Sequence, residues 1–160
     1  MHPTKNSLPE KERIQTITLL QARLVDAIDL TLQSKQAHWN VKGPSFIALH
    51  ELFDKVSEEA EGYVDLLAER IVQLGGVAKG TMESVVKNSS LPVYSVTISS
   101  GAEHVAALSH ALASFGESVR SSIEQANEMK DAGTADLLTE ISRGADKYLW
   151  FVEAHHQSIN

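Results

Sequence analysis

The sequence predicts an all-α protein, a four-helix bundle in which one connection between helices is long. Apolar residues recur at steps of three and four over four long segments, which is the period of amphipathic helices. Capping residues, glycine and proline fall near the ends of these segments. The chain has 160 residues, of which 42% are hydrophobic, enough for one domain with a buried core. We therefore expect a single domain over residues 1–160, with a mobile tail at residues 1–9.

The first two helices are expected before and after Gly43 and Pro44. Ser7 and Glu10 form a candidate capping box for the first helix. The apolar stripe of this helix consists of Ile14, Ile17, Leu24, Ile28 and Leu32. The second helix should begin near Gly43 and Pro44 and end at Gly75 and Gly76, since proline suits a first turn and glycine ends helices. Its stripe consists of Leu49, Leu52, Phe53, Val56, Ala60, Tyr63, Leu67, Ile71 and Leu74.

The third helix should begin after Ser100, where Glu103 completes a capping box, and the fourth should follow a break at Gly133 and Thr134. Their stripes consist of Val105, Leu108, Leu112, Phe115, Val119, Ile123 and Ala126, and of Leu138, Ile141, Ala145, Leu149 and Val152. The connection between Gly75 and Ser100 is long, and residues 81–87 within it can form a short helix. A four-helix bundle with one long crossover is the ferritin-like arrangement, and such a crossover lets the second and third helices run parallel.

Composition excludes several function classes. The chain has no Cys, which excludes disulfides, thiolate metal sites and a cysteine nucleophile. It has neither a signal-peptide core nor an apolar run of about 20 residues, so we expect a cytoplasmic protein without a membrane span. The net charge of −7 opposes DNA binding, because DNA affinity depends on cations that neutralise phosphates. Residues 1–13 hold only Lys5, Lys11 and Arg13 against two glutamates, and residues 153–160 hold no Lys or Arg. DNA binding should therefore be weak or absent, and association with the nucleoid stays open.

Four potential metal ligands of the second helix lie on one face, away from its apolar stripe. At 100° per residue, with His50 at zero, Asp54, Asp65 and Glu69 fall at about 40°, 60° and 100°, whereas the stripe centres near 265°. A solvated acidic face would also explain this row. However, His50 with Asp54 and Asp65 with Glu69 are each pairs at i and i+4, so each pair can bind one ion.

The spacing of the two pairs favours a site shared between two chains. Eleven residues, or about 16 Å of helix, separate Asp54 from Asp65, so the pairs cannot share an ion within one chain. The residue numbers of His50 and Glu69 add to the same total as those of Asp54 and Asp65. Two antiparallel copies of this helix about a twofold axis would therefore bring each residue to its counterpart in the partner. The same rule joins Ile47 to Val72, apolar residues on this face. It also brings Glu58 close to Glu61, which counts against the arrangement because like charges repel.

His38, at the end of the first helix, is a further candidate ligand if the following loop folds it beside His50; a hydrogen-bonded structural role is the alternative. Two imidazoles and three carboxylates suit Fe(II), Mn(II) or Zn(II). Di-iron bundles use two Glu-x-x-His motifs, and this chain has one, at Glu153 and His156, so a di-iron site inside one bundle is not expected. His104 and His110 lie off the apolar stripe and are expected at the surface.

Three segments of the sequence resemble the Dps family, the mini-ferritins that protect DNA during starvation. They are residues 35–44 (KQAHWNVKGP), 50–54 (HELFD) and 65–70 (DLLAER), and the likeness extends over nearly the whole chain, including residues 149–151 (LWF). The resemblance implies a ferroxidase centre shared between subunits, with His38, His50 and Asp54 from one chain and Asp65 and Glu69 from its twofold mate. It also implies a hollow dodecamer that oxidises Fe(II), preferentially with hydrogen peroxide, and stores the ferric mineral.

The resemblance suggests further roles beside more ordinary ones. Trp39 either packs or lines the site and gives an electron to a stray oxidant. Lys35 is a candidate salt-bridge partner of a site carboxylate, in competition with a second iron ion. The family places acidic pore residues near the start of the fourth helix, where this chain has Asp131, Asp136 and Glu140, although Asp136 would also complement a helix dipole. The alternative functions are a DNA-coating nucleoid protein with a secondary metal site, and a helical oligomer without chemistry.

Overall fold

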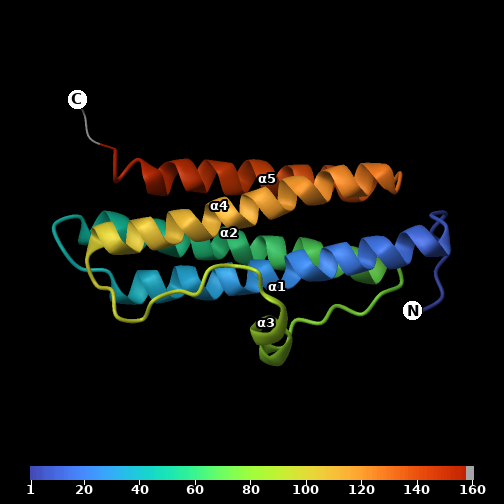
Figure 1. Cartoon of the computed structure of the whole chain (residues 1–160), viewed down its shortest axis with the longest axis horizontal. Coiled ribbons are helices and arrows are strands. Elements are labelled where there is room, and N and C mark those ends of the chain that lie inside the picture. The colour runs from blue at the N-terminus through green and yellow to red at the C-terminus, as the bar shows by residue number, and fades with distance from the viewer. Residues whose placement is uncertain (158–160) are drawn as a thin grey trace.

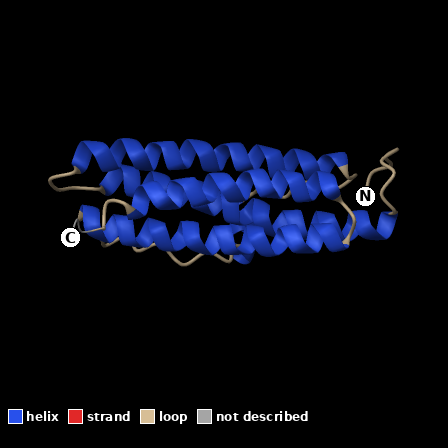
Figure 2. Cartoon of the chain, turned by 90° about the horizontal axis from the view of Figure 1, so that it is seen from above, coloured by secondary structure: helices blue, strands red, loops and turns tan. Residues whose placement is uncertain are grey.

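The computed structural model describes residues 1–157 and is all-α. Its helices are α1 (Glu10–Asn40), α2 (Phe46–Gln73), α3 (Met82–Asn88), α4 (Gly101–Glu128) and α5 (Ala132–Glu153). The four long helices form an elongated bundle in which α1 packs mainly on α2, and α4 on α5 (Figure 1, Figure 2). Within residues 1–157 no helix is both long and apolar enough to cross a membrane. The predicted four-helix bundle is confirmed.

The crossover between α2 and α4 returns along the length of the bundle and carries α3 beside α1 (Figure 1). As a result, α2 and α4 begin at the same end and run parallel, as predicted. The short helix α3 occupies the predicted segment, and the Thr81 hydroxyl caps it by accepting the Ser84 N–H at 3.4 Å.

Two helix ends form as the sequence predicts. At the start of α4, Ser100 accepts the Glu103 N–H while the Glu103 carboxylate accepts the Ser100 N–H, which is a complete capping box. At the end of α2, the Gly75 N–H donates to the Val72 carbonyl and the Gly76 N–H to the Ile71 carbonyl, both at 2.9 Å. This is a Schellman motif, and Gly75 has the positive φ of 89° that the motif requires.

The start of α1 differs from the prediction. The helix begins at Glu10 with Pro9 at the N-cap, so Ser7 lies two residues too early and the expected capping box does not form. Residues 1–9, expected to be a mobile tail, lie against the end of α2. The His2 N–H donates to the Gly75 carbonyl at 2.7 Å. The Arg13 guanidinium then joins this segment to α2 through the carbonyls of Leu8 and Leu74.

The break between α4 and α5 also lies elsewhere. We expected it at Gly133 and Thr134, but both are in the first turn of α5. The chain turns at Lys130, which has a φ of 58°, and Asp131 caps α5 by accepting the Thr134 N–H at 3.0 Å. The carboxylate of Asp131 is thus the stronger helix-start signal, since Asp is among the best N-cap residues.

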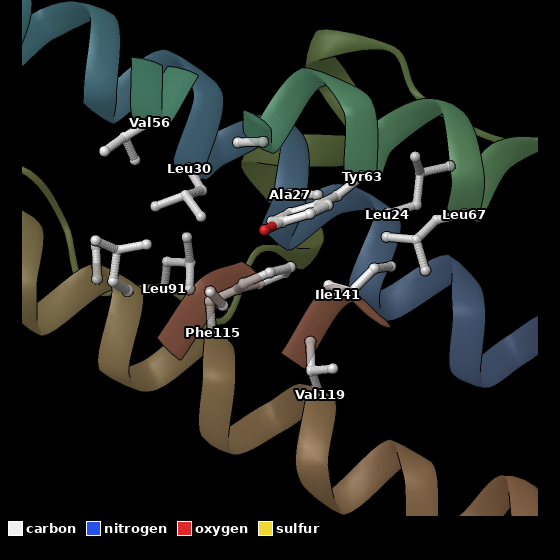
Figure 3. Packing of buried hydrophobic residues seen from close by; sticks show 14 of the residues in the cluster. Leu24, Ala27, Leu30, Val56, Tyr63, Leu67, Leu91, Phe115, Val119 and Ile141 are labelled. Carbon is white, nitrogen blue, oxygen red and sulfur yellow. The ribbon is translucent and has the colours of Figure 1, made fainter. Parts of the chain in front are cut away.

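The core is built from the inner faces of α1, α2, α4 and α5 (Figure 3). The predicted stripes of α2, α4 and α5 are buried or partly buried. The stripe of α1 is partly wrong, because Ile14 and Leu32 are exposed and the buried apolar row is Leu20, Leu24, Ala27 and Leu30. Since α1 contacts α2, α4 and α3, polar residues also fall on its buried surface, and apolar periodicity alone misplaces the stripe.

One of these buried polar residues, Asp26, anchors the crossover to α1. Its side chain is fully buried and accepts the Ser90 N–H at 2.7 Å and the Arg23 guanidinium at 2.8 Å. The same guanidinium donates to the Ser118 carbonyl and the Ser122 hydroxyl on α4. The carboxylate therefore ties α1, the crossover and α4 together, and its charge is paired and hydrogen-bonded, as a buried charge must be.

Replacing Asp26 with Ala should destabilise the protein by about 3–5 kcal/mol, because the Arg23 guanidinium would be left without its buried partner. The measurement is chemical unfolding followed by circular dichroism at one fixed protein concentration. The matched control is Asp146→Ala, which breaks the exposed Arg120–Asp146 pair and should cost less than about 1 kcal/mol. Equal losses in the two variants would contradict the anchoring role of Asp26.

Candidate metal centre

His38 and His50 meet where α1 turns into α2. Their rings stack with centroids 3.7 Å apart and planes 21° apart. The Nδ1 of His38 lies 2.7 Å from the His50 carbonyl oxygen, and the Nδ1 of His50 lies 2.8 Å from the His38 carbonyl oxygen. Because a carbonyl only accepts, each Nδ1 must carry a hydrogen, and in the neutral form of each ring the lone pair is then on Nε2. This is the tautomer of a metal-ligating histidine whose other ring nitrogen is held by the backbone.

The turn between α1 and α2 brings the two histidines together. Gly43 has a φ of 116°, a conformation that favours glycine, and its carbonyl accepts the Phe46 N–H at the start of α2. The turn is also tied to the chain before α4. The Lys42 N–H donates to the Ser99 carbonyl at 2.9 Å, and the Lys42 carbonyl accepts the Gly101 N–H at 3.0 Å. Backbone bonds from outside the turn therefore fix its path.

Asp54 lies one helical turn after His50 and forms an ion pair with Lys35 of α1. The hydrogen bond from Lys35 is the main cause that holds the pKa of the Asp54 carboxyl below its usual value, and desolvation partly opposes it. Each side chain is about one-third exposed. The salt bridge suggested for Lys35 therefore exists, and its partner is a candidate metal ligand.

Asp65 and Glu69 lie farther along α2, where both are exposed. Within residues 1–157 no three His, Asp or Glu side chains are close enough to hold one metal ion. The predicted ligands thus form two separate groups in one chain, with His38, His50 and Asp54 near the start of α2 and the other two near its end.

Large apolar side chains are exposed beside both groups. Ile47 is 61% exposed and Val72 is 58% exposed, one at each end of α2, and Trp39 next to His38 is 68% exposed. Exposed apolar residues that flank polar ones are typical of interaction surfaces. The face of α2 that carries the candidate ligands is therefore suited to be covered by another chain.

The three candidate pore residues occupy two kinds of environment. Asp131 is 3% exposed, caps α5 and accepts the Arg70 guanidinium at 2.8 Å, so its carboxylate is already engaged inside the subunit. Asp136 and Glu140 are exposed on α5. Asp136 lies beyond the first turn of that helix, where a helix dipole acts most strongly.

His104 was expected at the surface, but it is only 1% exposed. Its Nδ1 lies 2.6 Å from the hydroxyl of Tyr94 in the crossover. The apolar stripe of α4 gave no sign of this, because the crossover covers a second face of the helix. His110 is exposed as expected. His155 and His156 are exposed as well, and the Nε2 of His156 donates to the Ala102 carbonyl at 2.8 Å. Of the C-terminal segment 153–160 noted above for its lack of basic residues, residues 158–160 lie outside the described residues.

Comparisons with known proteins all point to the same protein family. A family model described as "Ferritin-like domain" matches residues 17–160. A "DNA protection during starvation protein" of Agrobacterium fabrum is 42% identical over 156 residues, which cover 98% of this chain and 96% of that protein. The structure of Mycobacterium smegmatis Dps in its tetragonal form is 38% identical with a TM-score of 0.93 and covers 98% of this chain and 95% of that one. DpsA14 from Streptomyces coelicolor is 35% identical with a TM-score of 0.92, over 97% of this chain and 92% of that one.

Proposed function

Because this chain belongs to the Dps family of ferritin-like proteins, we propose that it is a ferroxidase that oxidises Fe(II), preferentially with hydrogen peroxide, and stores the ferric mineral. The observation that carries the proposal is the reciprocal contact of His38 and His50. It leaves two Nε2 lone pairs available one helical turn before Asp54, and the described residues of one subunit do not complete a metal site there.

The proposed centre needs two chains. An antiparallel pair of α2 helices about a twofold axis would place the partner's Glu69 beside His50 and the partner's Asp65 beside Asp54. The exposure of Ile47 and Val72 supports this arrangement, because the same symmetry would bury one against the other. Glu58 and Glu61 are both exposed and would lie near the axis, where solvent must screen their charges.

The ligand set explains why iron would be oxidised there. Two Fe(II) ions each lose one electron, and the two electrons break the O–O bond of one hydrogen peroxide molecule without releasing hydroxyl radical. Carboxylates are hard ligands that stabilise Fe(III) relative to Fe(II), which favours the oxidation. Two imidazoles among three carboxylates would hold the ferric product loosely enough to pass it on. Trp39 would line this site, next to His38 in the sequence.

Storage requires an enclosed space, and we propose the hollow dodecamer of the family, built from twofold dimers. Iron would enter through pores lined by Asp136 and Glu140, whose exposed carboxylates attract cations. Asp131, which pairs with Arg70, would instead hold the helix turn beside the pore.

We further propose that the protein acts in the cytoplasm and protects DNA chemically, by removing Fe(II) and peroxide together. The name of the Agrobacterium fabrum relative, DNA protection during starvation protein, keeps DNA coating as a second candidate. The net charge of −7 disfavours coating, because it repels the phosphates of DNA. The docking of residues 1–9 on α2 also disfavours it, because this segment is then not a free cationic arm.

The decisive experiment is anaerobic addition of Fe(II), followed by peroxide, with ferric absorbance as the signal. The double variant His38→Ala/His50→Ala should lose most of the rapid ferric signal, because it removes both nitrogen ligands. His110→Ala is the matched control, since this histidine is exposed on α4 and should leave the signal unchanged. If the double variant oxidises iron like the unmodified protein, the proposed centre is wrong.

Lys35→Met should raise the number of Fe(II) ions bound per site, because the Lys35 ammonium occupies the Asp54 carboxylate that a second ion would use. Anaerobic isothermal titration measures this stoichiometry. Lys55→Met, an exposed residue on α2, serves as the control. An unchanged stoichiometry in Lys35→Met would refute the competition between lysine and iron.

Asp136→Asn should slow iron uptake while the shell stays intact, because it removes one negative charge from each chain at the proposed pore. Stopped-flow ferric absorbance measures the uptake, and size-exclusion chromatography checks the assembly. Asp146→Asn removes a carboxylate from another part of α5 and should not slow uptake. Equal uptake rates in all three proteins would exclude a role of Asp136 in entry.

A further inference from the structure

We propose that His104, held by Tyr94, is a positioning residue that fixes the His38–His50 pair in its metal-binding arrangement. The inference deepens the proposed function, on which it rests, because it assigns a role in that centre to two residues outside the ligand set. Tyr94 lies in the crossover and His104 in the first turns of α4. The crossover meets the start of α4 at the end of the bundle where α1 turns into α2 (Figure 1).

The Tyr94–His104 contact is short and partly buried. The tyrosine hydroxyl and the His104 Nδ1 are 2.6 Å apart, and their rings stack at a tilt of 20°. Burial raises the pKa of Tyr94 and lowers the pKa of His104, so the phenol keeps its proton and the imidazole stays neutral. The phenol therefore donates and Nδ1 accepts. This fixes the tautomer of His104 with its hydrogen on Nε2.

The Nε2 of His104 is buried, and the backbone carbonyl of Asn40 lies close enough to attract its N–H, although the contact falls short of a well-formed hydrogen bond. A buried donor with a poorly formed hydrogen bond contributes little to stability, and an apolar side chain would need no partner. A histidine that serves only to fill the core is therefore a poor choice at this position. A poorly satisfied buried polar group of this kind calls for an explanation, and its place beside the end of α1 supplies one.

His104 packs against the elements that carry the candidate ligands. Its ring lies 6.5 Å from that of Phe53, the residue directly before Asp54 on α2. The backbone of Asn40, two residues after His38, lies close enough to His104 to offset part of the lowering of its pKa. The imidazole thus contacts the end of α1 and the inner face of α2 at once.

The chain next to His104 also holds the turn that joins these helices. The backbone of Lys42 is bonded to Ser99 and Gly101, which lie between Tyr94 and His104 in sequence. The Tyr94–His104 contact therefore holds the end of the crossover against α4. The residues between them hydrogen-bond the turn between α1 and α2. Because each of His38 and His50 bonds the other's backbone, a small shift of α1 relative to α2 would break both bonds. This makes the histidine pair sensitive to how firmly the turn is held.

The test compares Tyr94→Phe, His104→Leu and His104→Asn in the assembled protein. Tyr94→Phe removes only the hydroxyl, and His104→Leu fills the same space without polar atoms. His104→Asn keeps an acceptor near the position of Nδ1 and should rescue the arrangement. Tyr63→Phe is the matched control, because the hydroxyl of Tyr63 likewise bonds a side chain, that of Glu59, elsewhere in the core.

Two measurements separate positioning from mere packing. The first is Co(II) affinity, measured anaerobically with the visible spectrum of the bound ion. We expect about a tenfold loss in Tyr94→Phe and His104→Leu, in the range found when partners that orient metal ligands are removed. His104→Asn and Tyr63→Phe should stay within about threefold of the unmodified protein by the same reasoning. Thermal unfolding of His104→Leu should show little loss of stability, since the variant replaces a poorly bonded donor with an apolar side chain and the Tyr94 hydroxyl is only partly buried.

The second measurement needs no metal. Nitrogen-15 solid-state NMR of histidine-labelled protein reports whether His38 and His50 keep their hydrogen on Nδ1. We expect this tautomer to be lost in part in Tyr94→Phe and kept in Tyr63→Phe. Unmodified tautomers together with unmodified Co(II) affinity in Tyr94→Phe and His104→Leu would overturn the proposal. A failure of iron oxidation in the unmodified protein would instead count against the ferroxidase proposal, and the tautomer measurement would still decide the role of His104.

Discussion

The path of the crossover is the constraint on which the rest of the structure depends, and the buried carboxylate of Asp26 fixes it. A chain that leaves one end of a bundle and re-enters at the other must lie on the outside of some helix. Asp26 binds Ser90 and, through Arg23, reaches α4, so the crossover lies along α1. This choice leaves the outer face of α2 uncovered, with its histidine, its carboxylates and its apolar residues.

The same path brings the end of the crossover to the turn between α1 and α2. The turn is too short to have a core of its own, and its geometry is set by backbone bonds to residues 99–101. The two histidine rings therefore depend on contacts with a segment about sixty residues away in the sequence. A second buried polar group, Arg70 with Asp131, fixes the other end of α2 on α5 in a comparable way. Both ends of α2 are thus held by polar contacts with later parts of the chain.

Much of this could be predicted from the sequence because the signals are local. Such signals are the helix periods, the capping box at Ser100 and the glycines after α2, each of which acts over a few residues. The common face of His50, Asp54, Asp65 and Glu69 follows from their spacing once the segment is known to be a helix. Features that depend on distant segments were missed. His104 is buried by Tyr94, and Ile14 and Leu32 are exposed because α1 has neighbours on several sides. The pairing of Asp131 with Arg70, residues 61 positions apart, was not predicted either.

The split of the candidate ligands along α2 has a consequence for how the proposed activity would depend on concentration. His38 and His50 are twelve positions apart in the chain and can meet as soon as one α1–α2 hairpin folds. If Asp65 and Glu69 belong to a centre shared with a second copy, a lone subunit contains two incomplete centres. One has only His38, His50 and Asp54, and the other has only Asp65 and Glu69. The number of complete centres then rises with the square of subunit concentration when dimers are scarce. Newly made chains would bind iron weakly until they assemble, so oxidation would begin only where an enclosed space is ready for the mineral.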